Sequence, residues 1–172
     1  MRIFSIILFL FSQYLVIGQN SLSVTKVERT KNQSENIPQN LHLSHIEINE
    51  QFIDFQRLNE SDYRQKMTYG DALSQSFDTL VPHYNYPINL NLPYHLNTLT
   101  FHFTAIDWKA THRIKYSHQL EGLEQNWTAP TKQTKVIYRD LPFGTYTFKV
   151  KTAGDNLQWS APLTYMFCIR RP

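Results

Sequence analysis

The sequence predicts an all-β protein, folded as an antiparallel β-sandwich, for the part of the chain after residue 87. Three observations support this prediction. Short stretches alternate apolar and polar residues with the period of two that is typical of a strand with one buried face. Turn sequences separate these stretches at intervals of roughly ten to twelve residues. Aromatic residues make up 14% of the 172 residues and supply large side chains for a core.

The clearest predicted strand is TLTFHFTAIDW, where Leu, Phe, Phe and Ala alternate with polar residues from Leu99 to Ala105. Other alternating stretches predict strands at INLNL (88–92), IKYSHQL (114–120), TKVIYRD (134–140), TYTFKVKTA (145–153) and PLTYMFCIR (162–170). The segments PYHLN, LPFG and GDNLQWS between them are turn sequences. We therefore expect residues 88–172 to form one β-sandwich.

The first 40 residues carry targeting and linker signals. Residues 1–18, MRIFSIILFLFSQYLVIG, contain one basic residue, an apolar run and small residues near the end, as a secretory signal peptide does. The apolar run is short for a membrane span. Residues 19–40 are polar and predict a flexible leader. We therefore expect contact with a membrane only transiently, through the signal peptide.

Residues 41–87 are predicted to form a leading strand and then a loop or short helix that decorates the main fold. LHLSHIEI (41–48) alternates, but its phase changes at Ser44–His45, which indicates a β-bulge. NESDYRQKM (59–67) predicts a short helix capped by Asn59 or Ser61. The rest of this segment has turn signals and little periodicity.

One turn has the sequence of a tyrosine corner. In DLPFGTYTF, Tyr146 follows a Leu-Pro turn at the start of a strand. A tyrosine at this position bonds its hydroxyl to the backbone upstream and fixes the crossover between two sheets. Gly144 supplies a positive φ for such a turn. We therefore assign Tyr146 a structural role.

The segment EGLEQNW (121–127) raises the question of whether its tryptophan is buried or binds a ligand. Gly122 permits a turn, and we expect Leu123 and Trp127 to pack back onto the core. We expect Trp159 to be buried in the same way. The alternative is an exposed Trp127 that stacks on a sugar, with neighbouring carboxylates bonding its hydroxyls.

Composition and motifs argue against several functions. The formal net charge is +3, and no basic run exceeds Arg170–Arg171, so nothing favours nucleic acid as a partner. The single cysteine, Cys168, cannot form an internal disulfide. The G-x-S-x-G pattern is absent, and the histidines lack the short spacing of zinc sites. His42 and His45 face opposite sides of a strand unless a bulge intervenes. We expect no enzyme activity, no cofactor and no metal.

The strands and turns also resemble a known family. YSHQLEGLEQNWT, VIYRDLPFGTYTFKVKTAG and LQWS are similar to the three-tyrosine (Y_Y_Y) domain of bacterial two-component regulators. With LPYHLNTLTFHFTAIDW, which resembles the entry strand of that domain, the likeness covers about half of the chain. The family pattern falls on Tyr116, Leu120, Gly122, Trp127, Tyr138, Leu141, Pro142, Gly144, Tyr146 and Trp159.

The resemblance implies an immunoglobulin- or fibronectin-like sandwich from the extracytoplasmic sensor region of hybrid histidine kinases. It implies a non-catalytic sensory or interaction module, periplasmic or secreted, that positions or dimerises receptor parts. In that family a β-propeller usually precedes this domain, and a membrane span and a kinase follow it. Neither a propeller nor a kinase lies within these 172 residues. A free-standing module, a component beside another receptor and a truncated remnant of a larger sensor kinase therefore remain open.

Two kinds of partner are expected. A protein partner or a second copy would pair with an uncovered edge strand, for which PLTYMFCIR is the candidate. The rival function is a secreted carbohydrate-binding module. It predicts exposed, coplanar rings on one face, formed by Trp108 with Tyr84 and Tyr86.

Overall fold

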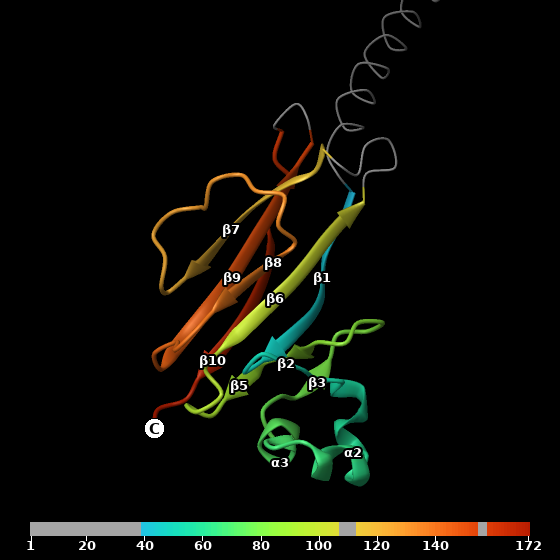
Figure 1. Cartoon of the computed structure of the whole chain (residues 1–172). Coiled ribbons are helices and arrows are strands. Elements are labelled where there is room, and N and C mark those ends of the chain that lie inside the picture. Colours follow the sequence, from blue (N-terminus) through green and yellow to red (C-terminus); the bar gives the residue numbers. More distant parts are fainter. Residues whose placement is uncertain (1–38, 107–112, 155–157) are drawn as a thin grey trace, which may run out of the picture. The chain divides into compact units, whose positions relative to one another are not determined.

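The computed structural model describes residues 39–106, 113–154 and 158–172 of the chain (Figure 1). These residues all belong to one compact unit, which spans Ile37–Pro172. The predicted signal peptide and nearly all of the predicted leader lie outside the described residues. Within the described residues, no helix is long and apolar enough to cross a membrane.

The described strands form two four-stranded sheets and one two-stranded sheet. The first sheet has the order β2-β1-β6-β8, the second β5-β10-β9-β7, and the third pairs β3 with β4. Paired strands are antiparallel except β5 and β10, which are parallel. The strands are β1 Gln39–Ile48, β2 Gln51–Phe52, β3 Thr79–Leu80, β4 Pro87–Ile88, β5 Leu90–Leu92, β6 Leu99–Ile106, β7 Lys115–Glu121, β8 Lys135–Tyr138, β9 Gly144–Ala153 and β10 Leu163–Ile169.

The two larger sheets enclose an aromatic core, which confirms the predicted sandwich. Phe101 on β6 stacks on Phe148 on β9, with ring centroids 4.3 Å apart and an interplanar angle of 5°. Both side chains are 0% exposed. Phe103 on β6 also contacts Tyr116 on β7, at 5.3 Å between centroids. Rings of this size each remove roughly 150–250 Å² from water, so this contact is a major source of stability.

The predicted alternation holds along β6 and fails at the start of INLNL. The four apolar positions from Leu99 to Ala105 are buried, with Thr100 buried as well, whereas Ile106 at the end of β6 is half-buried. Ile88, in contrast, is 38% exposed. Asn89 has a φ of 58°, and this left-handed residue separates β4 from β5. Ile88 therefore pairs with the short strand β3, while Leu90 and Leu92 face the core.

The predicted bulge in β1 is present. The pairing of β1 with β6 shifts in register between Leu43 and His45. Because of this shift, Leu43, Ile46 and Ile48 can all be buried although they do not follow one strict alternation. The bulge also determines which side chains share the outer face of the sheet.

Short helices fill the segment that the sequence left uncertain. They are the 3-10 helix η1 Phe55–Asn59 and the α-helices α2 Ser61–Lys66 and α3 Gly70–Ser74. Figure 1 shows them near the end of the sheet where β1 ends. The predicted helix within residues 59–67 exists, but its predicted cap is wrong, because the N-cap residue is Glu60 and its side chain makes no capping bond. Phe55, Leu58 and Leu73 attach this segment to the core.

Candidate functional site

Two buried tyrosines join the two sheets through their hydroxyl groups. The backbone N–H of Ala105 on β6 donates to Tyr116 Oη on β7, at 3.1 Å. Tyr138 Oη on β8 donates to Glu124 Oε2, at 3.2 Å, in the loop after β7. Tyr116 and Tyr138 are 4% and 7% exposed. Each tyrosine therefore adds a directional bond to the apolar contact between the sheets.

Glu124, in the segment EGLEQNW, belongs to a hydrogen-bond network inside the domain. Its Oε2 atom accepts hydrogen bonds from Tyr138 Oη and from the backbone N–H of Leu120, at 2.6 Å. His118 Nδ1 lies 3.2 Å from the same tyrosine hydroxyl. Burial raises the pKa of Tyr138, with a further contribution from Glu124. Burial also lowers the pKa of His118, against the opposing effect of Glu124. The carboxylate thus faces a structural network and does not project toward a ligand.

The predicted tyrosine corner is confirmed. Tyr146 Oη donates to the carbonyl of Pro142, at 2.8 Å, and Gly144 has a φ of 155°. The backbone N–H of Leu141 donates to the carbonyl of Asn97, at 3.0 Å, which anchors the same turn. Gly122 in the other turn has a φ of 100°, a conformation that favours glycine.

The predicted burial of the two tryptophans is wrong. Trp127 and Trp159 are only half-buried, and Leu123 is 51% exposed. The Nζ of Lys151 lies over both indole rings, 4.2 Å from the Trp127 centroid and 5.0 Å from the Trp159 centroid. Lys151 precedes Thr152 by one residue on β9 and follows the inward-facing Val150, so it points away from the core. The two rings therefore pack around a lysine on the outer face of the sheet.

The predicted sugar-binding surface is not formed by its tyrosines. Tyr86 is 8% exposed and contacts Tyr165 at 5.9 Å between ring centroids. Tyr84 is half-buried, and its ring is tilted by 39° from that of Tyr86. A pair with one buried ring and a 39° tilt does not present the coplanar surface that a sugar ring stacks on. Trp108, the third predicted member, lies outside the described residues.

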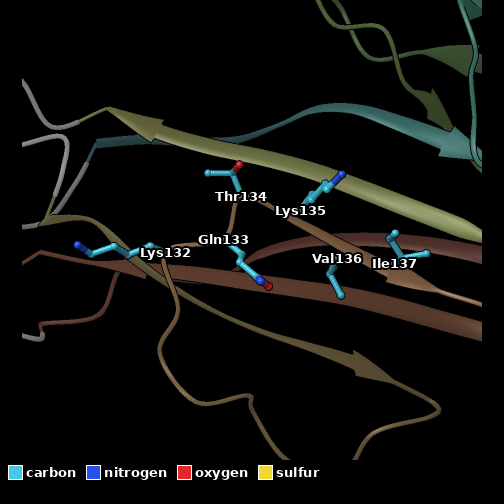
Figure 2. A pocket seen from close by; sticks show the side chains of 6 residues that line it. All are labelled: Lys132, Gln133, Thr134, Lys135, Val136 and Ile137. Carbon is cyan, nitrogen blue, oxygen red and sulfur yellow. The ribbon is translucent and has the colours of Figure 1, made fainter.

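A shallow hollow of about 510 Å³ follows the outer edge of β8. It is lined by Lys132, Gln133, Thr134, Lys135, Val136 and Ile137. Figure 2 shows these side chains along one extended segment. Three of these residues belong to β8, and the other three lead into it. A groove along an edge strand has the direction of an extended peptide.

The backbone of β8 has one free side. The carbonyl of Thr134 accepts a hydrogen bond from the N–H of Phe103, so even-numbered residues direct their backbone groups toward β6. Because these groups alternate in an antiparallel pair, those of Lys135 and Ile137 point away from β6. Among the described strands, none pairs with β8 on that side. This free edge is the candidate functional site.

The edge predicted from the sequence is a different one, and the structure covers it only in part, so pairing of a partner with it stays a prediction. PLTYMFCIR forms β10, which lies between β5 and β9. Its last residues, from Phe167 to Ile169, pair with β5 on one side and with β9 on the other. The strand β5 has only three residues, Leu90–Leu92. A segment this short does not show from its sequence which strand it pairs with.

The bulge in β1 brings together three side chains with metal-binding atoms. His45, Glu47 and His102 place one such atom each within 4.8 Å of one another. Glu47 Oε1 lies 3.8 Å from His45 Nε2 and 3.3 Å from His102 Nε2. Burial and the neighbouring His102 lower the pKa of His45, while Glu47 opposes the shift. The spacing of the histidines in the sequence did not predict this cluster, because the cluster includes a glutamate and a histidine from a second strand.

A comparison with known families identifies the domain. Residues 109–167 match the model of the Y_Y_Y domain. The chain contains a Y_Y_Y domain. The matched range includes Tyr116, Tyr138 and Tyr146, whose hydroxyls make the bonds described above. None of the curated proteins that were compared matches this chain.

Solved structures share the fold of this chain. One is the extracellular domain assigned to the hybrid two component system BT3049 from B. thetaiotaomicron, with a TM-score of 0.55 and 21% identity over 81% of this chain. Another is the extracellular domain assigned to the one component system BT4673 from the same organism, with a TM-score of 0.55 and 20% identity over 78% of this chain. This chain spans 16% of the length of each.

Proposed function

We propose that this chain is a non-catalytic, extracytoplasmic interaction module of a sensor system, which binds an extended, acidic segment of a neighbouring protein along β8. The Y_Y_Y domain and the shared fold with extracellular domains of bacterial regulators support the sensor context. The observation that carries the proposal is the free edge of β8 with its hollow.

The free edge favours strand addition. Each outward-facing residue offers one N–H donor and one C=O acceptor in an extended geometry. The side chains of Val136 and Ile137 are half-buried and provide apolar contact beside those groups. An added strand would satisfy the backbone groups and cover the apolar side chains at the same time.

Charge indicates the chemistry of the partner. Lys132 and Lys135 are exposed and line the hollow. Arg139 follows β8 but is paired with Glu50 at 2.8 Å, so the two lysines are the basic groups that this edge offers. Two copies of this edge, paired with each other, would bring basic residues together, and edge lysines are a common means of preventing such pairing. An acidic strand would instead gain opposite-charge pairs across the ladder. We therefore favour an acidic partner over a second copy.

The proposal can be tested with two labelled peptides that alternate valine with glutamate or valine with lysine. Fluorescence polarisation should show saturable binding of the glutamate peptide and none of the lysine peptide. Lys135→Glu should weaken the binding of the glutamate peptide by roughly three- to tenfold. Lys66→Glu, an exposed lysine on α2, is the matched control and should bind as the unmodified chain does.

Two results would contradict this proposal. Equal binding of both peptides would show that β8 does not recognise charge. A dimer in sedimentation that Lys135→Glu strengthens would show that the edge pairs with a second copy.

A further inference from the structure

The outer face of the first sheet carries the cluster of His45, Glu47 and His102, which the function proposed above does not use. His45 and Glu47 are two residues apart on β1, so they point to the same side of the sheet. His102 lies directly opposite His45 on β6. The two imidazoles stack, with centroids 4.0 Å apart and an interplanar angle of 17°. The three side chains thus converge from two adjacent strands.

The distances in the cluster match those of a metal site. Two ligand atoms bound to one tetrahedral Zn²⁺ at about 2.1 Å lie roughly 3.4 Å apart. Glu47 Oε1 is 3.3 Å from His102 Nε2 and 3.8 Å from His45 Nε2. The first separation is within about 0.1 Å of the tetrahedral value, and the second is within about 0.4 Å of it.

A buried nitrogen without a partner is the independent sign of a ligand. His102 Nε2 is buried and, within the described part of the chain, makes no hydrogen bond. Its 3.3 Å approach to Glu47 is therefore a close contact with the wrong geometry for a hydrogen bond. An orphaned polar atom of this kind costs free energy, which a bound ion would recover.

The ligand atoms select the class of metal. Two imidazole nitrogens and one carboxylate oxygen suit Zn²⁺, whereas Mg²⁺ and Ca²⁺ prefer oxygen ligands alone. We propose that His45, Glu47 and His102 bind one Zn²⁺ ion, with water as the fourth ligand. His45 and Glu47 are 27% and 26% exposed, which leaves access for the ion and for that water from their side, while His102 Nε2 is the buried ligand atom. Lys135 on β8 lies opposite His102 and is exposed. Its positive charge weakens the attraction of the site for a cation, but the exposed side chain leaves the site open.

Equilibrium dialysis and calorimetry with Zn²⁺ alone test the site. We expect one ion per chain and a rise in melting temperature, with no comparable effect of Mg²⁺. The variants His45→Ala, Glu47→Gln and His102→Ala should each lose the ion or bind it at least roughly tenfold more weakly. His42→Ala is the matched control, because His42 lies on the same strand and outside the cluster, and it should bind Zn²⁺ normally.

The outcome is decided by comparing the variants. Glu47→Gln keeps the size of the side chain, so it remains informative if His102→Ala does not fold. As a second readout, bound Co²⁺ should give the visible absorption of a four-coordinate site, which the same variants abolish. Unchanged Zn²⁺ binding in Glu47→Gln and His45→Ala, equal loss in His42→Ala, or no binding at all would overturn the proposal.

Discussion

Phe148 and Lys151 lie three residues apart on β9 and face opposite sides of the sheet. Phe148 stacks on Phe101 of the other sheet, and neither ring is exposed. Lys151 lies against two indole rings that reach it from the flanking loops. The inner contact follows from strand alternation, whereas the outer one depends on where two loops return to the sheet. The contacts inside the sandwich thus follow from the alternation along each strand, whereas the contacts on its outer faces depend on tertiary structure.

The largest difference between the two faces should appear when Phe148 is truncated. Phe148→Ala leaves a cavity between the sheets and should lower the free energy of unfolding by about 3–5 kcal/mol. Denaturant unfolding measures this change. Met166→Ala, at a position 63% exposed on β10, is the control and should change stability by no more than about 0.5 kcal/mol. Similar effects of the two substitutions would contradict the assignment of the core.

A smaller effect is expected from the hydroxyl that joins the sheets at Tyr138. Tyr138→Phe keeps the ring but removes one of the two donors to Glu124 Oε2, the other being the backbone N–H of Leu120, so stability should fall by about 1–3 kcal/mol. Tyr94→Phe, at a ring 41% exposed, provides the comparison and should be neutral. If both variants unfold at the same denaturant concentration, Tyr138 contributes only its ring.

On the outer face, Lys151→Met removes the charge from between the tryptophans. The expected loss is about 0.5–1 kcal/mol, the value of an exposed cation–π contact. Tryptophan fluorescence should change in this variant and not in Lys66→Met. A loss as large as that of Phe148→Ala would mean that the outer face is part of the core.

The smallest effect is a pH dependence due to His118. Its pKa is lowered by burial in the folded chain, so the unfolded chain binds the proton more readily. The stability from the neutral ring is fully present above the unfolded pKa of about 6.5 and declines as pH falls below it toward the lowered value. His118→Gln should flatten the decline between pH 7.5 and 5.5 in thermal unfolding. An unchanged slope would assign it to another group, such as His45.

Much of the interior could be predicted from the sequence because alternation leaves little choice of face. The strands β6, β7, β9 and β10, the bulge in β1 and the tyrosine corner at Tyr146 all followed from period and turn chemistry. The prediction that Trp127 and Trp159 are buried is wrong because both lie in loops, where no periodicity indicates which side chains face the core. The sequence alone could not show that Lys151 lies close to both rings.

The candidate edge could not be predicted because it depends on strand order. Sequence patterns show that β10 is a strand, but they do not show that the three residues of β5 cover it. For the same reason, the free side of β8 follows only from its pairing with β6. The cluster of His45, Glu47 and His102 likewise requires the register of two strands that lie far apart in the sequence.

Hydrogen exchange of the β8 amides tests the central claim, that this strand presents a free edge to a partner, most directly. In the free chain, the amides of Val136 and Tyr138 should exchange slowly and those of Lys135 and Ile137 rapidly. Addition of the valine–glutamate peptide should slow the exchange of Lys135 and Ile137. Equal protection of all four amides in the free chain would contradict the account, because another strand would then already cover the edge.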